Sequence, residues 1–86
     1  MRIRWLRAAL RNLDEEASYI ATDDPVAAAK VFERVLGAVA LLAEHPAIGR
    51  PGRIPGTREL VVPGTRYVVP YRVEGAEVQI LRVFHT

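Results

Sequence analysis

The fold is decided by the stretch from residue 13 to residue 30, which reads LDEEASYIATDDPVAAAK. Its first half continues a pattern, begun at residue 6, in which apolar residues recur every three or four positions, as on one face of a helix. Asp24-Pro25 then starts a second helix, because aspartate is a favoured N-cap and proline is favoured at the first helical position. His45-Pro46 ends that helix, since a residue before proline avoids helical dihedrals. We therefore predict two antiparallel helices, over residues 6–22 and 25–45, joined by a tight link.

The segments on both sides of this helical hairpin have the patterns of β-strands. Ile3 and Trp5 alternate with arginines, which indicates a short first strand. A loop rich in glycine and proline covers residues 47–57, and Pro63-Gly64 later suits a type II turn. Three strand-like runs follow the loop, over residues 58–62, 66–73 and 77–84, and the last is apolar enough to lie inside a sheet.

Pro70 interrupts the middle run. Proline cannot donate a ladder hydrogen bond, so we expect an edge position or a bulge at this residue. The predicted fold is α+β, with a short N-terminal strand, a two-helix antiparallel hairpin and a three-stranded antiparallel sheet. At 86 residues the chain is expected to be one domain, residues 1–86.

Size and composition indicate a protein that depends on a partner. A domain this small buries only about 60% of its unfolded surface. The chain has no cysteine, so neither a disulfide framework nor a thiolate metal site can stabilise it. No apolar run approaches the roughly 18–20 residues that span a bilayer, and the N-terminus lacks the pattern of a signal peptide. We expect a cytoplasmic location, no membrane association and an obligate protein partner.

Charge is distributed unevenly along the chain. Residues 1–45 carry six basic and seven acidic groups, a net of −1, whereas residues 46–86 carry six basic and three acidic groups, a net of +3. Arginine has a planar fork that engages phosphates or carboxylates in pairs. The second half therefore predicts a surface for an anionic partner, either nucleic acid, an acidic peptide or an acidic protein surface. Its expected target-binding residues are Arg50, Arg53, Arg58, Arg66, Arg72 and Arg82, with Arg58 and Arg72 near the far ends of paired strands.

Ordinary catalytic sets are missing from the sequence. The histidines have no zinc-site spacing, no glycine-rich phosphate loop opens a helix, and the sole serine lies in the first helix. We expect no cofactor and no metal. RNA cleavage through the 2′-hydroxyl would need a base and an acid, which arginine cannot supply because it stays protonated. The candidates for proton transfer are His85, Tyr67, Tyr71 and Glu59, although both tyrosines could instead be core or stacking residues and His85 could be an idle residue at a frayed end.

Motifs in a fixed order along nearly the whole chain resemble the ParE/RelE superfamily of toxins from type II toxin–antitoxin systems. Each motif is weak alone, but together they are specific. The motifs are LDEEASYIA at 13–21, DP at 24–25 with AAA at 27–29, LAEHP at 42–46 with IGR at 48–50, GR at 52–53, GTREL at 56–60, YVVPYRV at 67–73 and ILRVFH at 80–85.

The resemblance implies a toxin that is neutralised by a cognate antitoxin, a flexible segment of which wraps apolar grooves. Its ParE-like branch is described as poisoning DNA gyrase without hydrolysing anything, and its RelE-like branch cleaves messenger RNA on the ribosome. In one nuclease subgroup an acidic residue follows a turn comparable to Gly49-Arg50-Pro51-Gly52, and this chain lacks it. That subgroup ends in His-Tyr, whereas this chain ends in His85-Thr86.

Three functions remain open on this basis. The first is a toxin that binds DNA gyrase and has no catalytic activity of its own. The second is a ribosome-dependent endoribonuclease acting on mRNA, in which Arg58, Arg66 and Arg82 would hold the phosphate and His85 would act as the acid. The third is an inactive relative that serves as an antitoxin-binding co-repressor module.

Overall fold

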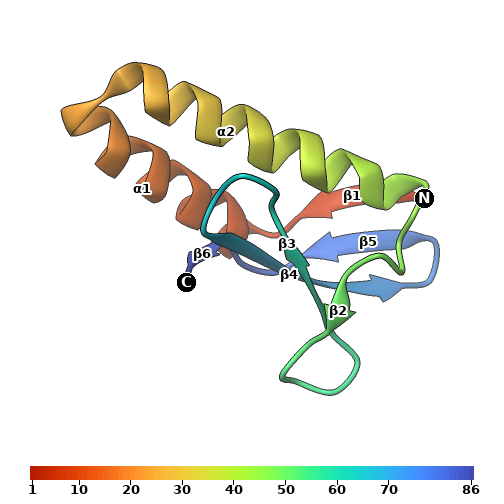
Figure 1. Ribbon diagram of the computed structural model, residues 1–86. Helices are drawn as coiled ribbons and strands as arrows, with labels where there is room; N and C mark the ends of the chain where they lie inside the picture. The colour runs from red at the N-terminus through yellow and green to blue at the C-terminus, as the bar shows by residue number, and fades with distance from the viewer.

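The computed structural model describes every residue from Met1 to Thr86 and follows the predicted order of one strand, two helices and then further strands (Figure 1). The α+β class is confirmed. The elements are β1 Arg2–Trp5, α1 Arg7–Asp23, α2 Pro25–Ala40, the 3₁₀ helix η1 Leu41–Ala43, β2 Arg50–Pro51, β3 Arg58–Val61, β4 Tyr67–Glu74, β5 Glu77–Ile80 and β6 Phe84–His85.

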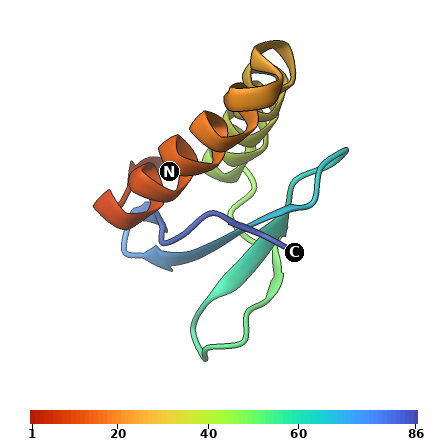
Figure 2. The same cartoon turned by 90° about the vertical axis from the view of Figure 1, so that its left-hand side faces the viewer.

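One sheet contains all the strands, in the order β1-β5-β4-β3-β2, with β6 also paired to β4. β1 runs parallel to β5, and the other pairs are antiparallel. The two parallel strands are far apart in the sequence, because α1, α2 and the strands β2, β3 and β4 lie between them. The two views show both helices on one face of the sheet, while the loop between β2 and β3 projects away from them (Figures 1 and 2). The opposite face is therefore free of helix.

The helical hairpin forms where the sequence predicts it. Asp24 caps α2, its Oδ1 accepting a hydrogen bond from the Ala27 backbone N–H at 3.0 Å, and Pro25 occupies the first position. The second helix is shorter than predicted, because α2 ends at Ala40 and tightens into η1, which places Leu42 fully in the core. Neither helix is long and apolar enough to cross a membrane.

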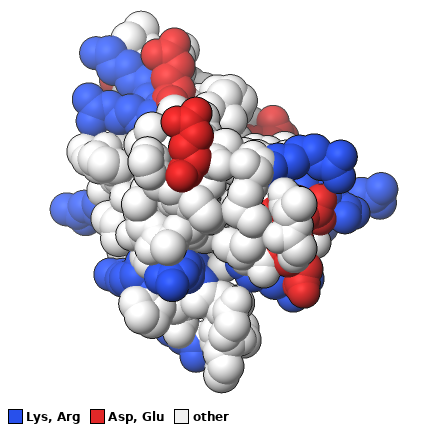
Figure 3. Space-filling model, turned by 90° about the vertical axis from the view of Figure 1, so that its right-hand side faces the viewer, with Lys and Arg blue, Asp and Glu red and all other residues white.

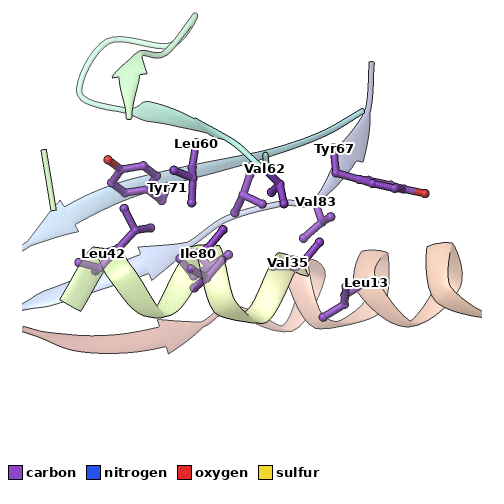
Figure 4. Packing of buried hydrophobic residues seen from close by; sticks show 14 residues of the cluster. Leu13, Val35, Leu42, Leu60, Val62, Tyr67, Tyr71, Ile80 and Val83 are labelled. Carbon is purple, nitrogen blue, oxygen red and sulfur yellow. The ribbon is translucent and has the colours of Figure 1, made fainter. Parts of the chain in front are cut away.

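The core lies between the helical hairpin and the face of the sheet beneath it. Figure 4 shows Val35 and Leu42 pointing toward Val62 and Ile80, with Tyr71 near one end of the core and Tyr67 at the other. This packing assigns the odd-numbered residues of β4 to the helix side. The 14 members of the core are Ala9, Leu13, Val35, Ala38, Val39, Leu42, Leu60, Val62, Tyr67, Val69, Tyr71, Val78, Ile80 and Val83.

A bulge opposite Pro70 divides the third predicted run into two strands. β4 pairs Tyr71 with Ile80 in β5 but Val68 with Phe84 in β6, so two residues of β4 oppose three on the other side. Pro70 has no N–H to donate, although its carbonyl still accepts from the Leu81 N–H at 2.9 Å. Pro70 thus lies in an interior strand at a bulge, one of the two predicted outcomes, and the single run over 77–84 was wrong.

The loop predicted over residues 47–57 contains a short strand. Residues 50 and 51 form β2 and pair with Glu59 and Arg58 of β3, and the Gly52 N–H donates to the Thr57 carbonyl at 2.8 Å. The pair covers only two residues of β2, one of which is a proline, which explains why no alternation in the sequence indicated it. The segment is therefore held as a hairpin against the edge of the sheet.

Tyr71 fixes the entrance of this hairpin. The side chain is fully buried, and its hydroxyl donates to the Pro46 carbonyl at 2.7 Å and accepts from the Gly49 N–H at 2.9 Å. A Cβ at Gly49 would lie 2.6 Å from Tyr71 Cε1, so only glycine allows this approach. Of the two interpretations of Tyr71, the structural one holds, since the hydroxyl joins the end of the helical layer to the sheet.

We predict that Tyr71→Phe lowers the free energy of unfolding by about 2 kcal/mol, because it leaves the buried Gly49 N–H and the partly buried Pro46 carbonyl without their partner. Urea unfolding followed by circular dichroism measures the change. Tyr19→Phe is the matched control, since Tyr19 is 78% exposed. A loss in Tyr71→Phe no greater than in Tyr19→Phe would contradict the role assigned to this hydroxyl.

Candidate target-binding surface

The helix-free face of the sheet carries a hollow of about 410 Å³ between the β2–β3 loop and the bulge. Glu59 and Pro70 are paired across β3 and β4 and both line it. Around them, loop and bulge residues supply apolar surface and two guanidinium groups. The lining residues are Arg53, Ile54, Thr57, Glu59, Pro70, Leu81, Arg82 and Phe84.

Glu59 is a buried carboxylate held by two of the predicted arginines. The residue is 6% exposed. Arg50 places Nη2 3.0 Å and Nε 3.3 Å from Glu59 Oε1, and Arg53 Nε lies 3.8 Å from Oε2. Burial of a carboxylate requires such compensation. Arg50 and Arg53 therefore belong to an internal ion-pair group, which the sequence analysis did not identify.

Arg53 also links this group to an aromatic ring. Its guanidinium carbon lies 6.0 Å from the centroid of Phe84, within the range of a cation–π contact. The Arg53 side chain is nonetheless 80% exposed. Arg53 is therefore positioned by Glu59 and Phe84 while its remaining donors stay available to a partner.

Arg58 and Arg72 lie on opposite faces of the sheet. Arg58 is in register with Tyr71 on the helix side and donates to the Gly49 carbonyl at 2.9 Å and the Ala47 carbonyl at 3.3 Å. Arg72 is on the helix-free side, where its Nε donates to Gln79 Oε1 at 2.8 Å. The sequence places these arginines near each other, but the register separates them by the thickness of the sheet.

Arg82 and Arg66 have no carboxylate partner in the chain. Arg82 stands at the hollow and donates only to the carbonyl of its neighbour Leu81, at 2.8 Å. Arg66 precedes β4, and its backbone carbonyl accepts from the N–H and hydroxyl of Thr86 at 2.8 and 3.0 Å. Figure 3 shows that the basic side chains at one end of the molecule lie in several separate groups, some of which have acidic side chains beside them. The structure thus brings Arg53 and Arg82 together at one hollow.

Most candidates for proton transfer lie away from this hollow. Burial, followed in effect by the nearby Glu16 carboxylate, raises the pKa of Tyr67 to about 12, so its hydroxyl stays protonated at neutral pH. His85 is in register with Tyr67 and meets its ring edge to face at 5.3 Å. Because residues alternate along β6, Phe84 lines the hollow while His85 lies on the other side of the strand.

Only Glu59 among the four candidates lines the hollow, and its carboxylate is engaged by Arg50 and Arg53. No group of three or more histidine, aspartate or glutamate side chains is placed to hold a metal ion. Chemically, the hollow offers a free guanidinium, a second exposed one and an apolar floor. The apolar floor consists of Ile54, Leu81 and Phe84, which were not predicted from the sequence. Pro70 did indicate the bulge beside which this floor forms.

Sequence comparison relates the chain to toxins over almost its entire length. Residues 3–86 match the family described as the ParE toxin of the type II toxin–antitoxin system parDE. The candidate toxin Y4kP of Sinorhizobium fredii is 56% identical over 84 residues, covering 98% of this chain and 86% of that protein. Toxin RelE1 of Caulobacter vibrioides is 33% identical over 79 residues, covering 90% and 84%.

Solved structures show the same fold. A chain of the chromosomal ParDE toxin–antitoxin system from P. aeruginosa superposes with a TM-score of 0.91 at 30% identity, covering 100% of this chain and 96% of that one. A chain of the RelBE2 toxin–antitoxin complex from Mycobacterium tuberculosis gives a TM-score of 0.64 at 30% identity, covering 99% and 96%. Family and fold agree along the whole sequence, and the chain belongs to the ParE family of type II toxin–antitoxin toxins.

Proposed function

We propose that this toxin stops growth by binding DNA gyrase through the helix-free face of its sheet, without catalysing a reaction, and that a cognate antitoxin neutralises it. The antitoxin partner is supported by relatives that come from toxin–antitoxin complexes. The gyrase target follows from the ParE-like resemblance. The contact surface is the hollow that carries Arg53 and Arg82.

The main support for this proposal is that the exposed arginines lie apart from the side chains that could transfer a proton. A nuclease needs an acid and a base beside the phosphate that its cations hold. Here Arg82 and His85 lie on opposite sides of β6, and the Tyr71 hydroxyl is occupied by two backbone groups. An exposed arginine pair over an apolar floor instead suits an acidic, partly apolar segment of a protein.

Ribosome-dependent cleavage of mRNA is the alternative, and similarity to RelE1 of Caulobacter vibrioides favours it. It would use Arg58, Arg66, Arg82 and His85 together. In this structure Arg58 donates to two loop carbonyls and His85 packs against Tyr67. Arg58 and His85 would have to leave these contacts on the ribosome before all four residues could act on one phosphate.

We predict that the purified toxin inhibits supercoiling by gyrase and that excess antitoxin relieves the inhibition. The Arg82→Ala variant should need a roughly tenfold higher concentration for half-inhibition, because loss of a central arginine contact weakens an interface by about this much. Arg11→Ala removes the same charge from an exposed site on α1 and should match the wild type. Equal potency of the Arg82→Ala and Arg11→Ala proteins would exclude the hollow as the contact surface.

A second prediction concerns catalysis. Because His85 lies away from the hollow, expression of His85→Ala should arrest growth as strongly as expression of the wild type, and the 5′ ends of cellular mRNA should not change during arrest. Mapping of mRNA ends after induction measures this. New ends that appear with the wild type and disappear with His85→Ala would establish the nuclease instead.

A further inference from the structure

A second hollow, of about 520 Å³, lies between the last turns of α1 and β6. Glu16, Tyr19 and Ile20 line it from the helix, and Tyr67 and His85 line it from the sheet. It is on the opposite side of β6 from the arginine hollow, which Phe84 lines. The function proposed above uses none of these five residues.

The chemistry of this second hollow suits a cation. Glu16 is half-buried, and no arginine, lysine or histidine of the chain forms an ion pair with it. Tyr67 and His85 stand edge to face at 5.3 Å with a 78° angle between their planes, and the Tyr19 side chain is 78% exposed. Aromatic faces attract ammonium and guanidinium groups, and a partly buried carboxylate gains most from a partner of opposite charge.

We propose that this hollow receives one lysine or arginine side chain of the cognate antitoxin, with Glu16 as the ionic partner and the Tyr19 and Tyr67 rings as the walls. The proposal rests on the antitoxin part of the function proposed above and is independent of gyrase. Burial and then the Glu16 carboxylate raise the pKa of Tyr67 to about 12, which agrees with a Glu16 carboxylate that lies close to the Tyr67 hydroxyl in the hollow.

The antitoxin is the occupant that the charges favour. The hollow on the helix side carries the unpaired carboxylate of Glu16, whereas the helix-free face of the sheet carries the unpaired Arg82. The two faces therefore call for partners of opposite charge. A basic partner on α1 would also find apolar surface to cover, because a groove of about 360 Å³ lined by Ala17, Ala21 and Phe32 borders the same turns of the helix.

The test is the affinity of the toxin for purified cognate antitoxin by isothermal titration calorimetry. Glu16→Gln should weaken binding by roughly tenfold, the effect expected when a partly desolvated cation loses its ionic partner. Glu15→Gln, an exposed neighbour on the same helix, should bind like the wild type. Tyr19→Ala, at a side chain that is too exposed to matter for folding, should weaken binding as well. Thermal unfolding identifies any variant that fails to fold.

A double-mutant cycle then identifies the antitoxin residue. Each lysine and arginine of the antitoxin is changed to alanine and titrated against wild-type toxin and Glu16→Gln, and one substitution should weaken binding to the wild type but not to the variant. Equal affinities of Glu16→Gln and Glu15→Gln, or additive losses for every basic residue, overturn the proposal. Loss of gyrase inhibition by Glu16→Gln with unchanged antitoxin binding also overturns it. These titrations measure antitoxin binding alone, so they test the proposal even if the toxin does not inhibit gyrase.

Discussion

The arrangement of both hollows depends on a bulge opposite Pro70, which has no N–H to donate to the neighbouring strand. The proline occupies an interior strand, and the neighbouring strand accommodates it with one extra residue. Strand residues alternate between faces, so a one-residue insertion reverses the alternation beyond it. Ile80 faces the core before the bulge and Val83 after it, which leaves Arg82 exposed at the hollow. Without the insertion, strand alternation would place residue 82 on the same side as Ile80, toward the core.

The molecule consequently has two hollows of different chemistry, one on each side of β6. On the helix-free side, Arg53 is held by Glu59 and Phe84 beside a free Arg82, which suits an acidic partner. On the helix side, Glu16 lies among aromatic rings, which suits a basic one. This chain of 86 residues leaves apolar side chains such as Leu10 and Phe32 exposed, at 51% and 39%. A partner that covers them would stabilise the fold as well as regulate it.

Local signals in the sequence were sufficient for the helical hairpin, because the Asp24 cap and the spacing of apolar residues act within a few positions. The strands predicted over residues 58–62 and 66–73 match β3 and β4 to within one residue, whereas the run predicted over 77–84 divides into β5 and β6. The sequence also did not reveal which arginines share a face of the sheet. Whether Arg58 and Arg72 share a face depends on pairing between distant segments, and the cluster of six arginines separated once the register was known. Similarly, the ion pairs of Glu59 and the strand at residues 50–51 arise only when the hairpin closes on the sheet.

We propose that the two sides of β6 bind two different macromolecules. The chain has no cysteine, so a single introduced cysteine can carry a photo-crosslinker at one defined position. Ile54, in the arginine hollow, and Tyr19, in the aromatic one, are 69% and 78% exposed. We expect the label on Ile54→Cys to crosslink to gyrase and the label on Tyr19→Cys to crosslink to the antitoxin. Crosslinking of the Ile54→Cys label to ribosomal components instead of gyrase, or of both labels to the same partner, would contradict the account.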